Sequence, residues 1–168
     1  MADVFLSLGA NEGDREAKIM MAIEFLKNTR GIIIAAISSL YETEALSDSD
    51  QPNYINCVVR VETDLDPHSL LKETQSIEAM LGRKPDSHMM PRPIDIDILL
   101  YDRADVHSMD LMIPHSRLKQ RRFVLVPLLE IEPDAIDPVT KKPLKAFLKQ
   151  TESQKVKKIK DKKEVWDA

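Results

Sequence analysis

Residues 91–102 have the sequence PRPIDIDILLYD, in which an apolar segment is interrupted twice by aspartate. Isoleucine at every second position (Ile94, Ile96 and Ile98) is typical of a strand with one buried face. Aspartate is among the poorest strand formers, so Asp95 and Asp97 are unexpected there. Side chains two positions apart point the same way, which places the two carboxylates together, about 7 Å apart at the backbone. The segment therefore predicts a strand with one apolar face and one acidic face.

The segments around this strand predict a mixed order of strands and helices. The expected strands cover residues 3–10, 32–43, 54–63 and 94–101. The expected helices start after Asp14 and Asp66, which can cap them, and stop at Gly31 and Gly82. Residues 111–114 (LMIP) and 121–131 (RRFVLVPLLEI) add a short strand and a helical segment. The order βαββαβ indicates an α+β fold of the ferredoxin-like kind, an antiparallel sheet with helices packed on it and additional C-terminal elements.

The alternation in residues 54–63 (YINCVVRVET) has a consequence for the acidic strand. If the helices cover the face that holds Ile55, Cys57 and the isoleucines of residues 94–98, then Tyr54 and Asn56 lie on the opposite face. The two aspartates lie on that opposite face as well. Two separate strands thus bring unusual polar side chains to one side of the sheet.

The bulk composition is that of an ordinary globular domain, with 43% hydrophobic and 31% charged residues among 168. The net charge of −4 gives no global positive field that would attract nucleic acid. The single cysteine, Cys57, excludes an intramolecular disulfide and a cysteine-based zinc site. The first residues have no basic segment followed by a long apolar run, so we do not expect them to be a secretory signal. The sequence also has no apolar run of the roughly 18 residues that a membrane span requires. We expect a cytoplasmic protein with neither a membrane nor a nucleic-acid partner.

The chain is expected to form one domain over residues 1–150, followed by a lysine-rich C-terminal appendage over residues 151–168. The appendage has the sequence TESQKVKKIKDKKEVWDA and is expected to be a solvated helix or a loose tail. Cys57 is expected to be a small core residue. We expect the domain to act as a monomer.

The acidic pair and a basic segment after it suggest a site for Mg²⁺-bound polyphosphate. Neighbouring carboxylates repel each other, which makes it costly to keep both ionised, and a divalent cation beside them removes that repulsion. Carboxylate oxygens are hard ligands, which suit Mg²⁺. The cations that could grip phosphate oxygens are Arg92, His115, Arg117, Lys119, Arg121 and Arg122. Taken alone, an acidic pair of this kind more often belongs to the solvent-exposed face of a strand. The basic segment alone could be the solvent-exposed face of a helix or a patch that binds the backbone of a nucleic acid. The combination of the two favours the polyphosphate site.

Glycine is scarce, with four residues at positions 9, 13, 31 and 82. Neither GxxxxGK[ST] nor GxGxxG can be drawn through them. If the protein binds ATP, it does so without a glycine-rich phosphate cradle.

Six stretches of the chain match one known family in collinear order. They are LSLGANEGD (6–14), SSLYETEAL (38–46), DQPNYINCVV (50–59), LLKETQSIEAMLGR (70–83), PRPIDIDILLYD (91–102) and IPHSRLKQRRFVLVPLLEIEP (113–133). Together they make roughly residues 3–150 resemble the 6-hydroxymethyl-7,8-dihydropterin pyrophosphokinases of folate biosynthesis. That family has a ferredoxin-like fold and moves the β,γ-diphosphate of ATP onto the hydroxymethyl oxygen of the pterin, releasing AMP. The resemblance implies a pyrophosphokinase domain over residues 1–150 with these two small-molecule substrates.

The resemblance also implies roles for individual residues. Asp95 and Asp97 would hold two Mg²⁺ ions and, with Arg83 and Arg92, would form the catalytic set. The ATP-binding residues would be Gln75, Glu78, Arg83, Arg92, Ile98, His115, Ser116, Lys119 and Arg121. The pterin-binding residues would be Thr43, Leu46, Tyr54, Asn56 and Phe123. The flat pterin ring would lie between the rings of Tyr54 and Phe123, with its edge hydrogen-bonded by Asn56, which suits a flat heteroaromatic ligand.

The chain departs from the family mainly in the loop before Arg92, where Met89 and Met90 replace the usual Trp-Gly. On the residues alone, two other interpretations stay open. A different two-metal nucleotidyl transferase would carry the same acidic pair, but it would not predict Tyr54, Asn56 and Phe123 together. A module that binds RNA or a protein would carry aromatic residues, rather than paired acids, on the exposed sheet face.

Overall fold

A computed structural model describes residues 1–43, 53–83 and 93–166 of the chain. Its centre is a six-stranded sheet in the order β5-β1-β4-β3-β8, with β2 also paired to β4. The strands are β1 (Ala2–Ala10), β2 (Ile32–Ile37), β3 (Leu40–Thr43), β4 (Tyr54–Thr63), β5 (Asp95–Tyr101) and β8 (Val156–Lys160). All the pairings are antiparallel. The predicted α+β fold, an antiparallel sheet with helices packed on it, is confirmed.

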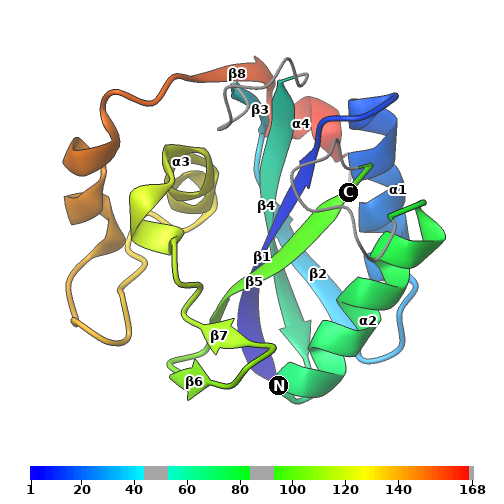
Figure 1. The fold of residues 1–168 in the computed structure, drawn as a ribbon, viewed down its shortest axis with the longest axis horizontal. Helices are drawn as coiled ribbons and strands as arrows, with labels where there is room; N and C mark the ends of the chain where they lie inside the picture. Colours follow the sequence, from blue (N-terminus) through cyan, green and yellow to red (C-terminus); the bar gives the residue numbers. More distant parts are fainter. Residues whose placement is uncertain (44–52, 84–92, 167–168) are drawn as a thin grey trace.

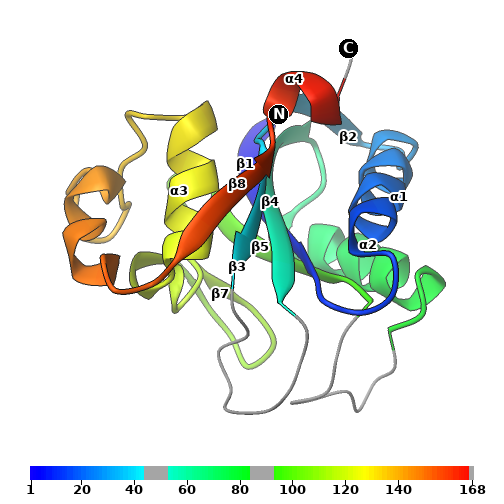
Figure 2. The same ribbon diagram turned by 90° about the horizontal axis from the view of Figure 1, so that it is seen from above.

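Two helices cover one face of this sheet, α1 (Arg15–Lys27) and α2 (Pro67–Met80), as Figures 1 and 2 show. Both begin as the sequence predicts, since Asp14 and Asp66 each accept a hydrogen bond from a backbone N–H three residues on. Their buried side chains pack with the apolar face of the central strands, which includes Ile55, Cys57 and Ile96. The predicted division of the sheet into two faces is therefore confirmed.

A third helix, α3 (Arg122–Ile131), lies on the other side of the sheet, across from α1 and α2 (Figures 1 and 2). It follows the short 3-10 helix η1 (Leu118–Gln120) and packs Leu125 and Leu128 on Phe5 and Val58 of the sheet. The predicted helical segment at residues 121–131 is thus confirmed. Because α3 contacts only part of that face, the end of the sheet that carries Asp95 and Asp97 is not part of the α3 core.

The strand expected over residues 32–43 is broken into β2 and β3 at Ser38 and Ser39. Ser38 turns its hydroxyl onto the neighbouring strand, where it accepts a hydrogen bond from the backbone N–H of Val58 at 2.9 Å. Its own N–H donates to the carbonyl of Val58, also at 2.9 Å. A side-chain oxygen thus replaces a backbone acceptor, so the ladder stays satisfied while the strand changes direction.

The lysine-rich C-terminal segment differs from the expected solvated helix or loose tail. Residues 156–160 form β8, which pairs with β3 at one end of the sheet, and the short helix α4 (Lys162–Val165) follows. Val165 is 4% exposed and packs in the core under α1. The chain reaches β8 through two 3-10 turns, η2 (Leu144–Phe147) and η3 (Lys149–Thr151). This expectation was wrong because strand pairing with β3 and the burial of Val165 together hold the segment in place.

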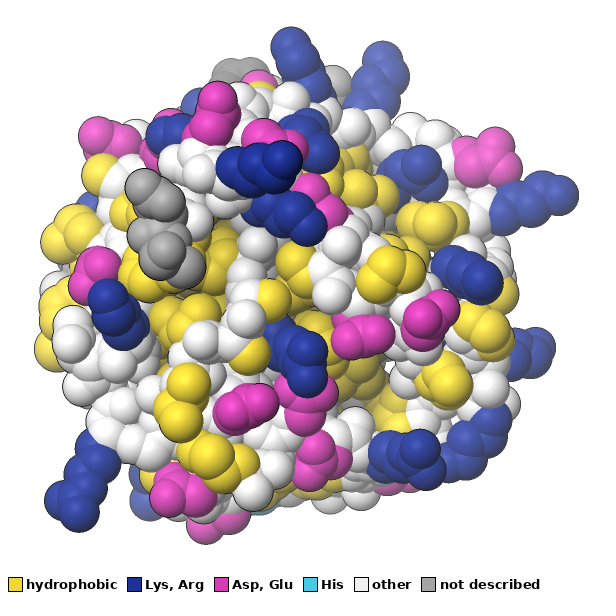
Figure 3. Space-filling model, turned by 180° about the vertical axis from the view of Figure 1, so that it is seen from behind, with side chains coloured by type: hydrophobic (Ala, Val, Ile, Leu, Met, Phe, Trp, Pro, Cys, Tyr) yellow, Lys and Arg dark blue, Asp and Glu magenta, His cyan; other side chains and the backbone are white. Residues whose placement is uncertain are grey.

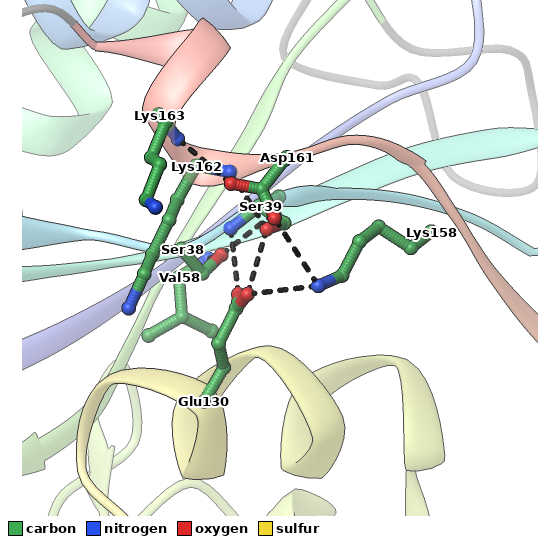
Figure 4. Close-up of polar contacts among 8 residues, drawn as sticks. All are labelled: Ser38, Ser39, Val58, Glu130, Lys158, Asp161, Lys162 and Lys163. Atoms are coloured by element: carbon green, nitrogen blue, oxygen red, sulfur yellow. Dashed lines mark hydrogen bonds and ion pairs between the residues drawn. The ribbon is translucent and has the colours of Figure 1, made fainter.

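One carboxylate ties α3, β3 and the C-terminal segment together (Figure 4). Glu130 of α3 accepts hydrogen bonds from the backbone N–H and the hydroxyl of Ser39, at 2.7 and 2.6 Å, and lies 3.4 Å from the ammonium of Lys158. The same hydroxyl accepts a hydrogen bond from the backbone N–H of Lys162 at 2.8 Å. Burial would raise the pKa of Glu130, but the donors from Ser39 and Tyr41 hold that pKa below its ordinary value.

The remaining elements form a small hairpin of β6 (Val106–His107) and β7 (Met112–Ile113) beside the sheet, so the predicted strand at LMIP is confirmed. None of the helices in the described part of the chain is long and apolar enough to cross a membrane. On the face seen from behind, basic and acidic side chains are intermingled with hydrophobic ones (Figure 3).

Candidate active site

The candidate site begins with a row of residues that runs across three strands on the face opposite α1 and α2. In the register of the sheet, Asp95 lies opposite Gly9, and Gly9 lies opposite Asn56. One step along, Asp97 lies opposite Ser7. Residues opposite each other in a ladder point to the same face, so the two carboxylates and the Asn56 amide share one side of the sheet. The structure therefore brings together the acids and the polar side chains of β4, as predicted.

Gly9 leaves the middle position of this row, between Asp95 and Asn56, without a side chain. A Cβ atom at position 9 would lie 2.7 Å from Oδ1 of Asn56 and 3.7 Å from the ring of Tyr54. Asn56 is 3% exposed, and its amide nitrogen donates to the hydroxyl of Thr43 at 3.1 Å. The amide is thus held in one orientation, with its oxygen over the backbone of Gly9. The sequence pattern gave no role to Gly9, although a glycine inside a strand is the signal of such a close approach.

Asp95 is paired with Arg83, which stands at the end of α2. The guanidinium Nη1 of Arg83 lies 2.8 Å from Oδ1 of Asp95 and 2.5 Å from Oε2 of Glu78. That glutamate oxygen also accepts a hydrogen bond from the backbone N–H of Ile96 at 2.8 Å. Burial raises the pKa of Glu78 to about 7, an effect that the N–H of Ile96 and the charge of Arg83 oppose. Glu78 and Arg83, which were predicted to bind ATP, and Asp95, which was predicted to bind metal, therefore form one connected group.

Arg121 brings positive charge, and His115 an imidazole ring, close to Asp97. Burial lowers the pKa of His115, while the negative charge of Asp97 acts in the opposite direction. The backbone N–H of Arg117 donates to Nδ1 of His115 at 3.1 Å, so Nδ1 carries no proton and the neutral ring carries its proton on Nε2. Burial also lowers the pKa of Arg121, whose guanidinium lies 5.5 Å from the ring centroid of Phe123. Of the predicted basic segment, His115 and Arg121 are thus partly buried near the acids, whereas the guanidinium of Arg122 donates to the carbonyl of Leu148.

Lys119 has a partner that the sequence did not indicate. Its ammonium lies 3.2 Å from Oδ2 of Asp137 and 5.3 Å from the ring centroid of Phe147. Asp137 is 1% exposed and also accepts hydrogen bonds from the N–H of Val139 and the hydroxyl of Thr140. Asp137 stands alone in a turn, so no motif could have revealed it before the fold was known.

The other predicted residues lie at more varied places. Gln75 is exposed on α2, and Ser116 is exposed beside His115. Ile98 is 4% exposed and packs in the core under α1 and α2, so its side chain does not share the face of Asp95 and Asp97. Tyr54 and Phe123 are half-buried, at the start of β4 and of α3. Leu46 and Arg92, together with Met89 and Met90, lie outside the described residues.

The acidic pair has the chemistry of an Mg²⁺ site that is completed by substrate. Within the described residues, no group of three or more His, Cys, Asp and Glu side chains could enclose a metal ion. Mg²⁺ usually keeps several waters and binds through one or two carboxylates and the phosphates of a substrate. Two half-buried carboxylates on one strand face, with cations placed to hold phosphate, fit that donor set.

The chain matches the model of the 7,8-dihydro-6-hydroxymethylpterin-pyrophosphokinase (HPPK) family over residues 5–133. It is 44% identical over 136 residues to the 2-amino-4-hydroxy-6-hydroxymethyldihydropteridine pyrophosphokinase of Methylorubrum extorquens, covering 81% of this chain and 86% of that protein. The protein of the same name from Aquifex aeolicus is 44% identical over 147 residues, covering 88% of this chain and 91% of that protein.

Two longer proteins share the same region. The folic acid synthesis protein of Schizosaccharomyces pombe is 41% identical over 153 residues, which cover 91% of this chain but 21% of that protein. The crystal structure of wild-type Plasmodium falciparum HPPK-DHPS with pteroate is similar in fold, with a TM-score of 0.71 at 17% identity, over 90% of this chain and 42% of that chain. The chain thus spans most of its bacterial relatives and less than half of these two proteins. Since the family model matches most of the chain and the bacterial relatives are similar along nearly their whole length, the chain belongs to the 7,8-dihydro-6-hydroxymethylpterin-pyrophosphokinase family.

Proposed function

We propose that the protein transfers the diphosphate of ATP to the hydroxymethyl group of 6-hydroxymethyl-7,8-dihydropterin and releases AMP. The observation that carries the proposal is the row of Asp95, Gly9 and Asn56 across three strands. It sets an oriented amide, which can pair with the edge of a heteroaromatic ring, beside carboxylates that can hold a metal–polyphosphate. The names of the bacterial relatives support the same reaction.

In this proposal Asp95 and Asp97 hold two Mg²⁺ ions, which would neutralise the developing charge and align the attacking oxygen. The residues proposed to bind the phosphates and nucleotide of ATP are Gln75, Glu78, Arg83, Arg92, Ile98, His115, Ser116, Lys119 and Arg121. For Ile98 the contribution is confined to the backbone, because its side chain lies in the core. To contact phosphate, the ammonium of Lys119 would either leave Asp137 or contact Asp137 and phosphate at the same time.

The pterin is proposed to lie between Tyr54 and Phe123, with Thr43, Leu46 and Asn56 around its edge. Thr43 lies opposite Tyr54 in the β3–β4 ladder, and its hydroxyl already receives a hydrogen bond from Asn56. These contacts would orient the ring of the bound pterin. A site that pairs polar edge groups rejects analogues that lack them.

We also propose that residues 1–150 contain the catalytic machinery and that the protein acts as a cytoplasmic monomer. The buried free thiol of Cys57 is compatible with a reducing compartment. Size-exclusion chromatography with light scattering tests the monomer. Truncation at residue 150 tests the boundary, and we expect it to lower stability because β8 pairs with β3.

The activity is tested by incubating the protein with ATP, Mg²⁺ and the reduced pterin. We expect AMP to form only when the pterin is present. Formation of ADP, or release of pyrophosphate without pterin, contradicts the proposal and favours another two-metal nucleotidyl transferase.

A further inference from the structure

Arg83 contacts two carboxylates of different kinds. Its Nη1 lies 2.5 Å from the glutamate of α2 and 2.8 Å from the first aspartate of β5. Glu78 is almost fully buried, with a side chain 8% exposed, whereas the Asp95 side chain is 18% exposed. The side chain of Arg83 is itself 26% exposed, so it is partly open to solvent. The guanidinium thus bridges a buried structural carboxylate and a more open one that is proposed to hold metal.

The backbone holds Arg83 in this place. Gly82 ends α2 with a φ of 101°, which an L-residue with a side chain rarely adopts. The N–H of Arg83 then donates to the carbonyl of Glu78 at 3.0 Å. The main chain and the side chain of Arg83 are therefore both tied to Glu78, and Asp95 is the contact that the arginine can release while its anchor remains.

A divalent cation at Asp95 would compete with this contact. Mg²⁺ binds carboxylate oxygen at about 2.1 Å, so the ion and the guanidinium would be close neighbours of like charge on one carboxylate. In a half-buried setting such repulsion is much stronger than in water. Phosphate oxygens can remove it, because they give the arginine fork a new anionic partner and supply ligands to the metal. The metal and the nucleotide should therefore help each other to bind.

We propose that Arg83 is an exchangeable cation, which neutralises Asp95 in the free protein and passes to phosphate oxygens when a metal–nucleotide complex binds. Glu78 keeps hold of the guanidinium through the exchange. Arg83 then makes metal binding depend on the nucleotide, since Asp95 in the free protein already has a cationic partner. This inference rests on the proposed function, in which Asp95 is a metal ligand.

The test is Mn²⁺ binding, followed by electron paramagnetic resonance or calorimetry, with and without a non-hydrolysable ATP analogue. In the wild-type protein without nucleotide we expect weak binding, and in Arg83→Gln we expect the Kd for Mn²⁺ to fall about tenfold or more. The gain in affinity that the analogue gives should shrink by a similar factor, because coupling is reciprocal. Arg83→Lys keeps the charge but not the fork, and its Kd should lie much closer to that of the wild type.

The matched control is Arg103→Gln, which removes the same charge from an exposed position just after the last residue of β5, Tyr101. We expect it to change the Kd for Mn²⁺ by less than about twofold, since exposed charges are strongly screened. Because Arg83→Gln leaves Glu78 buried without its cation, the double variant Glu78→Gln/Arg83→Gln is measured as well. It restores a neutral pair and should bind Mn²⁺ more tightly than Glu78→Gln alone.

The inference is overturned if Arg83→Gln and the double variant show no gain in Mn²⁺ affinity without nucleotide. It is also overturned if Arg103→Gln gives the same gain, because the effect would then be one of overall charge. The proposed function is judged separately, by pterin-dependent AMP formation in the wild-type protein. Normal AMP formation with unchanged Mn²⁺ affinities would reject the exchange and leave the reaction standing.

Discussion

The amide oxygen of Asn56 lies over the backbone of Gly9, only 2.7 Å from the point where a Cβ atom would stand. Gly9 has an ordinary strand conformation in the ladder between β4 and β5, so the close approach, rather than a special backbone angle, makes a side chain costly here. The orientation of the amide therefore depends on the absence of a side chain on the neighbouring strand.

Gly9→Ala should displace the Asn56 amide and weaken pterin binding by about 1–3 kcal/mol, the usual cost of overpacking. ATP binding should change little, because the clash is with Asn56. Calorimetric titration of each substrate measures the two effects. In an Asn56→Ala background the clash disappears, so Gly9→Ala should then cost almost nothing. Equal losses for both substrates, or additive losses in the double variant, would contradict this account.

Asp97→Ala should lower turnover by about a hundredfold or more, because it removes a proposed metal ligand. The fold should survive, since Asp97 is half-buried on the face opposite α1 and α2. Steady-state AMP formation and a thermal melt measure the two properties. The control is Asp105→Ala, which removes a carboxylate from an exposed position before β6 and should leave turnover unchanged. Near-normal turnover in Asp97→Ala would show that the metal is held elsewhere.

Phe123→Ala should weaken pterin binding by about 1–3 kcal/mol through the loss of ring stacking and burial. Part of the ring also packs on the α3 core, so the variant should be somewhat less stable. Phe147→Ala is the matched control, because Phe147 packs on the same core from another element. It should lose stability without a comparable loss of pterin affinity, as measured by fluorescence titration.

The contacts of Glu130 with Ser39 and Lys158 predict that the stability of the fold depends on pH (Figure 4). The pKa of Glu130 is lower in the folded protein than its ordinary value of 4.5, because donors from Ser39 and Tyr41 outweigh the effect of burial. The folded protein therefore favours the ionised form. This stabilisation is complete above pH 4.5 and is lost as the pH falls through the folded pKa.

Glu130→Gln should thus lower the free energy of unfolding by about 1–3 kcal/mol at pH 7. The difference from the wild type should shrink below about pH 4. Urea unfolding at several pH values measures it, with the exposed Glu152→Gln as the control. A difference that stays constant between pH 7 and pH 3 would mean that the ionisation of Glu130 does not stabilise the fold.

The sequence predicts those features of the fold that depend on alternation and on helix capping. Local patterns predict the two faces of β5 and the capping roles of Asp14 and Asp66. They also predict that Asn56 lies on the sheet face that α1 and α2 do not cover. The break at Ser38 does not, because it depends on a side-chain hydrogen bond to a strand distant in sequence. β8 escapes prediction for a similar reason, since its lysine-rich sequence is typical of solvent and only pairing with β3 makes it a strand.

The candidate site divides in the same way. The acidic pair is visible in the sequence because two residues on one strand share a face. The contact of Arg83 with Glu78 and Asp95 depends on how α2 ends against β5, and the contact of Lys119 with Asp137 joins residues from two distant turns. Ile98 is a different case. The resemblance to the family implies a role for it in ATP binding, but its side chain is buried, and a resemblance does not distinguish a role of the side chain from one of the backbone.

β8 is the last strand in the sheet order, and three of its five residues are lysines. An outermost strand offers unpaired backbone groups on which a strand from another molecule could assemble. A strand from another molecule would have to pair its backbone beside these lysine side chains. If that strand were a second copy of β8, the lysines of the two strands would repel each other. The end of the chain that completes the sheet thereby also guards the protein against aggregation through that edge.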